Sequence, residues 1–408
     1  MKKNLTSTQK TSTKEVLRFA HPFYTNTHLE QRPVVNGIGT RMTDYIKTQL
    51  EPIPAPQRDP AMMLSEIIGD AGVAEIEKAG AIRFHSVGDT GMETGNTEQM
   101  VADAMSKDYD PAKPDTSPAF FFHLGDVNYY DNTDKGYHAQ FYEPYKTYPG
   151  KIIAIPGNHD GELFKYDGSS TGQKISLGAF QENFCQPKTG IPSAAGTIYR
   201  EMINQPGVFW HLNTPFVDII GLYSNVAENP GYITVKSDEV NGNIQKDWLT
   251  KTLANISATR EAGQRKALII ATHHPPLSSG NHSSSTEMLI DIDDSCTKAN
   301  IMPDAFLSAH SHNIQCYTRY LSFNNKDIQI PFVVCGGGGR TIQHVPDADG
   351  TRINDQTVIK SYHTFDKSLK SYGYLDIIVT SDKLTINIFT VDNQGNRSLF
   401  NTIQVHLT

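Results

Sequence analysis

Five short apolar runs, each ending in a polar turn, constrain the fold of this chain more than any other feature. They begin at residue 81 and read "AIRFHSVGDTG", "PAFFFHLGDVNYY", "KIIAIPGNHDG", "KALIIATHHPP" and "MPDAFLSAHSHN". Apolar runs of this length are typical of strands that are buried on both faces of a sheet. Helix-compatible segments such as "TEQMVADAMSK" and "NIQKDWLTKTLANI" lie between them. Strands that alternate with helices predict an α/β sandwich, in which ligands sit outside the carboxyl ends of the strands.

The remaining segments predict additions to this arrangement. Residues 1–80 are polar and interrupted by prolines, with a helical pattern in "AMMLSEIIGDAGVAEIEKAG", and we expect them to form an N-terminal extension packed on a domain of residues 81–408. Residues 161–205 are rich in Gly, Ser and Gln and predict an insertion. From residue 372 onward the chain alternates apolar and polar residues, which predicts antiparallel strands that finish a second sheet.

Charge and hydropathy argue against some classes of partner. The 408 residues include 36 basic and 44 acidic side chains, a net charge of -8, so we expect neither nucleic acid nor an anionic membrane surface as a partner. No run of about 18 apolar residues occurs, so no membrane span is predicted. The N-terminus has two lysines without an apolar segment behind them, which predicts a cytoplasmic protein; a trimmed signal peptide would make it secreted or periplasmic. The four cysteines form no CxxC pair and are expected to stay reduced.

Carboxylate, amide and imidazole groups gather at the ends of the five predicted strands. They are Asp89, Asp126, Asn158, His159, His273, His310 and His312. Each is weak evidence alone, because Gly-Asp after a strand is commonly a turn and histidine pairs are often core residues. Together they form the ligand set that borderline metals favour. A carboxylate such as Asp126 would bridge two cations about 3.5 Å apart, because a shared anion offsets the repulsion between them.

These residues fall in an ordered series of motifs. The series is Gly88-Asp89-Thr90-Gly91, Gly125-Asp126-Val127-Asn128-Tyr129, Gly157-Asn158-His159-Asp160, His273-His274-Pro275 and His310-Ser311-His312. It resembles the calcineurin-like metallophosphoesterase superfamily and, within it, the purple acid phosphatases, whose motifs are DxG, GDxxY, GNH[DE], VxxH and GHxH. The resemblance covers residues 81 to about 320 and implies a four-layer αββα sandwich of two mixed sheets flanked by helices. Ala309 and Ile270 depart from the family pattern by small changes.

The resemblance also implies two metal ions. The first would be held by Asp89, Tyr129 and His312, the second by Asn158, His273 and His310, and both by the bridging Asp126. Gly91 stands where the wider superfamily has a metal-binding histidine, and Tyr129 is the position that distinguishes the purple acid phosphatases. A phenolate favours Fe(III), so the implied centre is Fe(III) paired with Fe(II), Zn(II) or Mn(II).

Two histidines are expected to act on the substrate. In the resemblance His159 binds the phosphate or assists the leaving group, and His282 has the spacing from His273 at which the family places its proton donor. A protonated imidazole at His282 would neutralise the departing alkoxide, an effect worth about 10²-fold in rate. The alternative is that His282, in "SSGNHSSS", is a solvated loop histidine.

Other polar features are assigned simpler roles. "CGGGGRTI", residues 335–342, lacks the phosphate-loop pattern GxxxxGK[ST] and predicts a flexible turn after the strand "IPFVV", with Arg340 as a further candidate for substrate binding. His274 is expected to pack behind the ligands. His85 and His123 lie inside apolar runs and are expected to be core histidines with their hydrogen bonds satisfied.

These observations predict an enzyme that hydrolyses small phosphate monoesters, of the acid phosphatase type, by in-line attack of a metal-bound hydroxide on phosphorus. A phosphodiesterase or nucleotidase of the same superfamily is the nearest alternative, because the rim residues 161–205 and 277–300 carry no motif that sets the size of the leaving group. A non-catalytic metal-binding scaffold with this fold is the alternative from another class. The intact ligand set argues against a scaffold. The natural substrate and the oligomeric state stay open.

Overall fold

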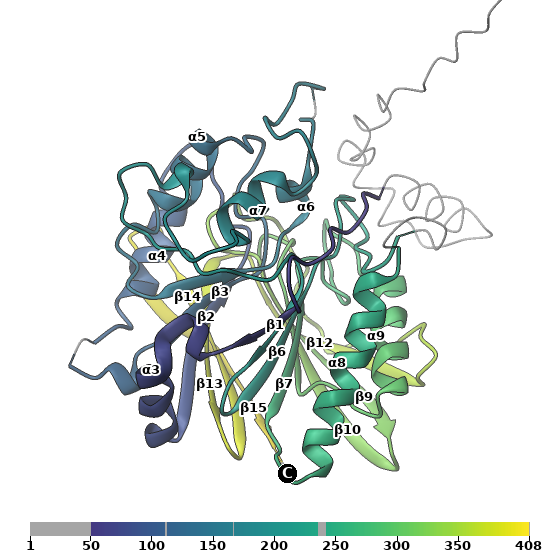
Figure 1. The fold of residues 1–408 in the computed structure, drawn as a ribbon. Helices are drawn as coiled ribbons and strands as arrows, with labels where there is room; N and C mark the ends of the chain where they lie inside the picture. Colours follow the sequence, from purple (N-terminus) through teal and green to yellow (C-terminus); the bar gives the residue numbers. More distant parts are fainter. Residues whose placement is uncertain (1–49, 111, 166, 236–241, 408) are drawn as a thin grey trace, which may run out of the picture.

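Two mixed β-sheets packed face to face frame the molecule (Figure 1). The computed structural model describes residues 50–407 except 111, 166 and 236–241. The strands of the six-stranded sheet are β2 (Ala81–Val87), β3 (Phe120–His123), β4 (Lys151–Ala154), β13 (Tyr372–Thr380), β14 (Lys383–Val391) and β15 (Arg397–His406). Those of the nine-stranded sheet are β1 (Ala61–Met63), β5 (Trp210–Asn213), β6 (Val217–Leu222), β7 (Ala267–Thr272), β8 (Ala305–Ser308), β9 (Ile314–Phe323), β10 (Lys326–Cys335), β11 (Arg352–Asn354) and β12 (Ser361–Leu369). Their spatial orders are β15-β14-β13-β2-β3-β4 and β1-β5-β6-β7-β8-β10-β9-β12-β11.

Helices flank both sheets. They are α3 (Ser65–Ala79), α4 (Thr97–Ser106), α5 (Asp134–Tyr137), α6 (Asn158–Gly161), α7 (Gly178–Phe184), α8 (Ile244–Glu261) and α9 (Thr286–Lys298), with short helical turns at Pro114–Thr116, His138–Tyr142 and Ser193–Ala195. Figure 1 shows α3 and α4 on the flank of the six-stranded sheet and α8 and α9 on the opposite flank. The predicted four-layer α/β sandwich is therefore confirmed.

The apolar runs form strands because both of their faces are covered. On β7, Ile269 belongs to the core that also contains Phe84 of the other sheet. The next residue, Ile270, belongs to a second core, which contains Leu253 of α8 and Leu289 of α9. Alternate side chains thus point into the space between the sheets and into the space under the helices.

The strands that carry the predicted site run parallel. β2, β3 and β4 are parallel neighbours in one sheet, and β7 and β8 are parallel neighbours in the other. All five arise from the five apolar runs, so the prediction of these strands is confirmed. β13, β14 and β15 pair antiparallel and complete the six-stranded sheet, as predicted. Parallel strands bring their carboxyl ends to one edge of a sheet, and the site lies there.

One predicted element is wrong in part. The helical pattern predicted from Ala61 onward begins with strand β1, which pairs in parallel with β5, and the helix starts only at Ser65. Met62 is buried between two exposed neighbours, and an alternation over three residues is too short to recognise in a sequence. Residues 1–49 lie outside the described residues, so the N-terminal extension stays a prediction, as does the insertion at 161–205.

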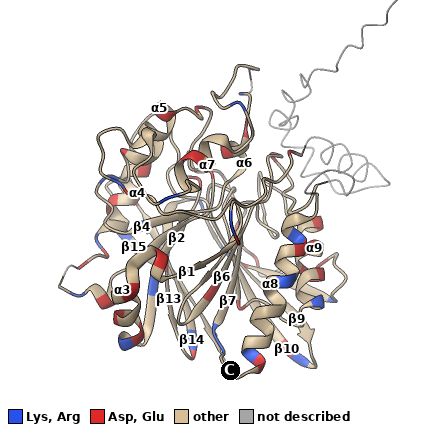
Figure 2. Ribbon diagram, in the orientation of Figure 1, with Lys and Arg blue, Asp and Glu red and all other residues tan. Residues whose placement is uncertain are grey.

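Acidic and basic residues are interspersed along the helices, strands and loops of the described chain in Figure 2. Within the described part of the chain, no helix combines the length and apolarity needed to cross a bilayer. The four cysteines are buried and unpaired.

Candidate metal centre

The predicted ligand residues all follow strands at the same edge of the two sheets. β2 leads to Asp89, β3 to Asp126, β4 to Asn158, β7 to His273 and β8 to His310. Three of these turns are sharp: Asp89, Asp126 and His310 have φ angles of 54°, 54° and 66°, in the left-handed region. This conformation costs a residue with a side chain about 1–2 kcal/mol. Such strain is typical of functional sites, where it directs side chains into a common space.

Close packing between turns keeps the backbone in place. A Cβ on Gly157 would lie 2.1 Å from Asp126 Oδ1, so only glycine allows the turn after β4 to approach the turn after β3. The carboxylate of Asp160 accepts hydrogen bonds from the backbone N–H of Gly157 at 2.8 Å and of Val127 at 3.3 Å. The backbone N–H of His159 donates to Asp126 Oδ1 at 2.9 Å, which leaves Oδ2 as the oxygen of Asp126 that can face a ligand.

One cluster of potential ligand atoms combines a carboxylate, a phenol and an imidazole. Tyr129 Oη lies 3.0 Å from Asp89 Oδ1 and 3.2 Å from His312 Nε2, and the latter two atoms are 3.5 Å apart. Nδ1 of His312 lies 3.0 Å from the carbonyl oxygen of Thr341, which can only accept. Nε2 of a neutral His312 is therefore bare and directed at the other two atoms.

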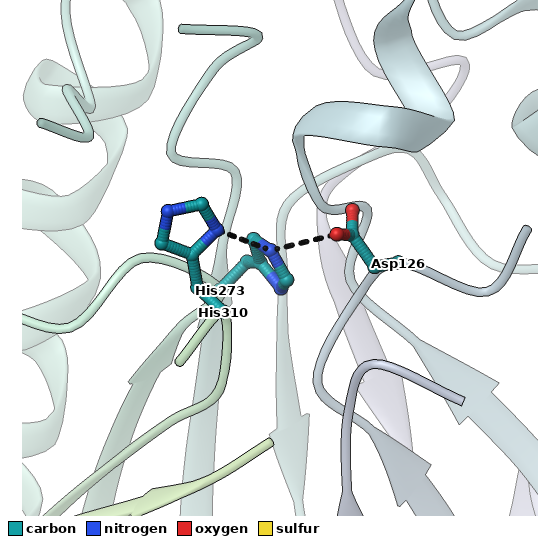
Figure 3. A group of neighbouring side chains, drawn as sticks. All are labelled: Asp126, His273 and His310. Carbon is teal, nitrogen blue, oxygen red and sulfur yellow. Dashed lines mark hydrogen bonds and ion pairs between the residues drawn. The ribbon is translucent and has the colours of Figure 1, made fainter. Parts of the chain in front are cut away.

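A second cluster surrounds His273 (Figure 3). Its Nε2 lies 3.1 Å from Asn158 Oδ1, 3.2 Å from His310 Nδ1 and 3.3 Å from Asp126 Oδ2. Nδ1 of His273 donates to the carbonyl oxygen of Leu124 at 2.9 Å, so Nε2 of the neutral ring carries no hydrogen. Its lone pair faces two further acceptors, the oxygens of Asn158 and Asp126. Asp126 Oδ2 is buried and receives no hydrogen bond from the described residues. The arrangement requires a positive charge at its centre.

The spacing within each cluster fits a metal ion. Ligand atoms bound at about 2.0–2.2 Å, with angles of roughly 90–110° between bonds, lie about 2.8–3.6 Å apart. The distances above, from 3.0 to 3.5 Å, fall in this range. One ligand atom each from Asp126, His273 and His310 lie within 4.8 Å of one another. Carboxylate, imidazole, amide and phenol groups are also chemically suited to a borderline or hard cation.

The pKa values of the buried groups are shifted in directions that also favour a positive charge at this position. Burial opposes protonation of His273, yet the charges of Asp126 and Asp89 raise its pKa to about 9. Burial likewise opposes ionisation of Asp126, but the nearby His273 and His159 hold its pKa below the usual value. Burial and the two carboxylates raise the pKa of Tyr129 well above 10, so its phenol keeps the proton until a cation displaces it.

A cavity of about 230 Å³ opens onto these clusters. It is lined by Asp126, Tyr129, Tyr130, His159, Glu228, His282, His310, His312, Arg340, Thr341 and Gln343. His159 Nδ1 lies 2.5 Å from Glu162 Oε1, and this contact directs the other ring nitrogen away from Glu162. His282 is 4 % exposed, so it is not the solvated loop histidine of the alternative interpretation. Burial, together with His312 and other nearby histidines, lowers the pKa of His282 well below its usual value, so the ring is neutral rather than the protonated imidazole expected from the sequence.

The glycine run at residues 336–339 follows β10 as predicted, but it is buried against the site. A Cβ on Gly336 would lie 2.5 Å from Asp89 Oδ2. Beyond the run, the backbone N–H of Arg340 donates to the carbonyl oxygen of Asp89 at 2.9 Å, and its guanidinium carbon lies 4.3 Å from the centre of the Tyr129 ring and 5.1 Å from that of Tyr130. The run thus places the positively charged guanidinium of Arg340 in the cavity wall.

Two residues of the loop after β6 were missed by sequence reasoning. Glu228 Oε2 accepts a hydrogen bond from Asn158 Nδ2 at 3.4 Å, and burial raises the pKa of Glu228 to about 7. Asn229 contacts both His282 and His310. The only signals in the sequence are their position after a buried strand and the Asn-Pro dipeptide, neither of which indicates a site.

The histidines assigned to packing have hydrogen-bond partners, as expected. His274 contacts Ser224 Oγ and the carbonyl oxygen of Ala227, each at 2.8 Å. His123 Nε2 lies 2.7 Å from Thr90 Oγ1. His85 lies 3.0 Å from the Tyr148 hydroxyl and 3.2 Å from Asp108 Oδ2.

Comparisons with known proteins agree with this fold. The sequence model of the calcineurin-like phosphoesterases matches residues 82–313, more than half of the chain. No curated protein sequence matches significantly. Among solved structures, the chain is similar to GAP50, the anchor in the inner membrane complex of Plasmodium, with 14% identity, a TM-score of 0.50, and coverage of 80% of this chain and 89% of that one. PhoD matches with 11% identity, a TM-score of 0.45, and coverage of 87% and 72%. At such identities the likeness to GAP50 concerns the fold alone.

Proposed function

The chain belongs to the calcineurin-like phosphoesterase family, and from that premise we propose that it is a dinuclear metal-dependent phosphomonoesterase of the acid phosphatase type. Family membership supports a metal-dependent hydrolase of phosphoesters. The observation that carries the finer proposal is the pair of ligand clusters at one cavity, with Asp126 Oδ2 directed at the second and lacking a hydrogen bond from the described residues.

The proposed ligands divide between the clusters. One ion would be held by Asp89, Tyr129 and His312. The other ion would be held by Asn158, His273 and His310. Asp126 would bind both ions. Metal ions bound there would lower the pKa of a bound water molecule, which would supply a nucleophile near neutral pH, and they would polarise the phosphate. The buried phenol of Tyr129 is the ligand that favours Fe(III), so we propose Fe(III) with Fe(II), Zn(II) or Mn(II) as its partner.

The remaining cavity residues act on the substrate. The guanidinium of Arg340 supplies a positive charge for phosphate oxygens. His159, held by Glu162, contacts the phosphate or the leaving group. His282 lines the cavity, and its buried Nε2 has no hydrogen-bond partner among the described residues, so this atom would donate to the leaving oxygen.

The small size of the cavity supports a compact phosphoester as the substrate. A volume of about 230 Å³ leaves room for a phosphate and a compact leaving group. We therefore propose a small phosphorylated metabolite as the partner of this site. A phosphodiesterase would hydrolyse a diester faster than the matching monoester, and a scaffold would hydrolyse neither.

The proposal is tested by comparing p-nitrophenyl phosphate with bis(p-nitrophenyl) phosphate as substrates, on protein whose metal content has been measured. We expect about two metal ions per chain and faster hydrolysis of the monoester. Metal-free protein without hydrolase activity after incubation with Fe, Zn and Mn would contradict the proposal. Preference for the diester would replace it with the phosphodiesterase alternative.

The role of iron has a separate test in the visible spectrum. A Tyr129 phenolate on Fe(III) absorbs visible light by charge transfer, so Tyr129→Phe should be colourless. Tyr130→Phe is the matched control, because the neighbouring ring contacts Arg340 but has no place in either ligand cluster, and it should keep the colour. An active, colourless wild-type enzyme that contains zinc or manganese would remove the iron assignment and keep the phosphoesterase.

A further inference from the structure

The side chain of Asn229 joins two histidines that face the cavity. Its Oδ1 lies 3.1 Å from Nε2 of His310, and its Nδ2 lies 2.9 Å from Nδ1 of His282. All three side chains are buried, and Asn229 is 0 % exposed. A single amide therefore connects a candidate metal ligand to the candidate donor for the leaving group.

The proton positions follow from groups that can only accept or only donate. The carbonyl oxygen of Leu124 requires the hydrogen of His273 on Nδ1, so Nε2 of the neutral ring is bare. A cation bound between His273 and His310 requires Nδ1 of His310 to be bare as well, which places the hydrogen of His310 on Nε2. That hydrogen points at Asn229, and the amide must offer its oxygen to accept it.

The orientation of the amide then decides the state of His282. With its oxygen toward His310, Asn229 presents Nδ2 to Nδ1 of His282, and because an amide nitrogen only donates, Nδ1 must accept. A neutral His282 then carries its hydrogen on Nε2, a buried atom that has no hydrogen-bond partner among the described residues, in a side chain that lines the cavity. The opposite amide orientation, with Nδ1 of His310 protonated, would reverse each bond and leave Nε2 of His282 bare.

We propose that Asn229 is a positioning residue that couples cation binding at His310 to hydrogen-bond donation by His282. This inference rests on the proposed function: His282 presents its donor to the leaving oxygen when a metal ion holds His310. The loop that carries the amide is fixed to the rest of the domain, because the backbone N–H of Gly231 donates to Ser285 Oγ at 2.9 Å. The amide thus keeps its place between the two rings, and its orientation is the variable.

Nitrogen-15 spectra of histidine-labelled, zinc-loaded protein test the coupling, because the chemical shift of a ring nitrogen changes strongly when the nitrogen gains a proton. In the wild type we expect Nδ1 of His282 to be bare and Nε2 to be protonated. Asn229→Asp keeps an acceptor for His310 but replaces the donor with a second acceptor. Zinc binding should therefore be retained, while Nδ1 of His282 gains a proton. The His282 signals are assigned by their loss in His282→Gln.

Kinetics supply a readout that a merely structural role would not move. Asn229→Leu removes both hydrogen bonds while keeping the number and branching of the side-chain heavy atoms, and the loss of the acceptor for His310 should weaken zinc binding about 10–100-fold. At saturating zinc, we expect kcat for glycerol phosphate to fall about tenfold or more. The kcat for p-nitrophenyl phosphate should fall less, because p-nitrophenolate leaves without a proton, and KM should change little.

Asn183→Leu is the matched control for the kinetics, since it removes a buried amide on α7 that accepts a hydrogen bond from the Tyr142 hydroxyl at 2.7 Å. It should affect the two substrates equally. The coupling is overturned by a protonated Nδ1 of His282 in the zinc-loaded wild type, by unchanged His282 signals in Asn229→Asp, or by equal losses for both substrates in Asn229→Leu. If the variants fail to fold, the wild-type spectrum alone still decides.

The outcomes separate this inference from the function on which it rests. A wild type that binds zinc and has the expected His282 state, but hydrolyses no phosphoester, would support the coupling and contradict the enzyme. A wild type that hydrolyses phosphoesters with Nδ1 of His282 protonated would contradict the coupling alone. A wild type that binds no zinc, iron or manganese would contradict both.

Discussion

Two buried groups of charge, one around Arg319 and one around Asp126, differ in how completely they are paired. Arg319 on β9 donates to both oxygens of Asp293, at 2.8 and 2.6 Å, and to Asp355 Oδ2 at 3.0 Å. The other oxygen of Asp355 faces His363 Nδ1 at 2.6 Å. Around Asp126, by contrast, unprotonated nitrogens and oxygens lie close together, and these acceptors outnumber the N–H and O–H groups that could donate to them.

The difference separates a structural cluster from a binding cluster. Arg319 is permanently charged, so it neutralises the buried carboxylates of Asp293 and Asp355 without an external ion. Near Asp126 the counter-ion must come from outside, as a proton on His273 or as a metal ion. Removing a partner should therefore reduce stability in the first cluster and function in the second.

Asp126→Asn should have the largest effect. We expect hydrolysis of p-nitrophenyl phosphate to fall by about 10³-fold or more, because the change removes the proposed shared ligand and with it several kcal/mol of transition-state stabilisation. The metal content should fall in parallel. The metal-free variant should unfold within about 1 kcal/mol of the metal-free wild type, since His273 can release its proton once the carboxylate is gone. Undiminished turnover would refute the role of Asp126.

Arg319→Met should reverse this pattern. The change leaves two buried carboxylates without their counter-ion, and we expect the free energy of unfolding in urea to fall by about 3–5 kcal/mol. Metal content per folded chain should not change. Arg352→Met, on the exposed strand β11, is the matched control and should cost less than about 1 kcal/mol. Similar costs for the two variants would contradict the comparison.

Metal removal should have an intermediate effect. At a free metal concentration about 100 times Kd, binding stabilises the folded state by about 2.7 kcal/mol, and a chelator should remove that contribution along with activity. Metal addition should restore both. In Asp126→Asn the chelator should not alter the free energy of unfolding. If it lowers the stability of the variant as much as that of the wild type, the metal binds elsewhere.

The smallest effect concerns pH and the Arg319 cluster. Burial alone would raise the pKa of Asp355, but hydrogen bonds from His363 and Ser361 and the charge of Arg319 hold it below the usual value. A carboxyl with a lowered folded pKa contributes stability above its unfolded pKa of about 4, and that contribution is lost as the pH falls through the folded value.

Urea unfolding of wild type and Asp355→Asn measures this contribution. The difference in stability between them should be full at about pH 7 and should shrink below about pH 4. The opposite trend, with the difference growing in acid, would mean that Asp355 has a raised pKa in the folded protein.

Most of the frame of the site could be predicted from the sequence, because the relevant signals are local. Each apolar run predicts a strand, and the residue that follows a parallel strand lies at the carboxyl edge of the sheet. Asp126 and His310 line the cavity for that reason, and Asp89 and His273 contact residues that line it. Their roles as ligands stay predictions.

The residues that orient the site could not be predicted in the same way. Glu228 lines the cavity and Asn229 contacts His282 and His310, and both lie on a loop whose path depends on packing against α9 and the turn after β7. The carbonyl oxygens of Leu124 and Thr341, which fix the tautomers of two histidines, have no sequence signature at all. The Arg319 cluster is equally hidden, since a charged residue within an alternating strand is usually solvent-exposed.

One contact between the sheets determines how a substrate can approach. The backbone N–H of His310, beyond β8, donates to Asp89 Oδ2, beyond β2, at 2.6 Å. Beside it, the backbone N–H of Gly338 donates to the carbonyl oxygen of Gly88 at 3.1 Å. These bonds fasten the two sheets together at the edge where the cavity opens. Separation of the sheets would break both bonds, so we expect substrate entry and product release to depend on movements of the surrounding loops.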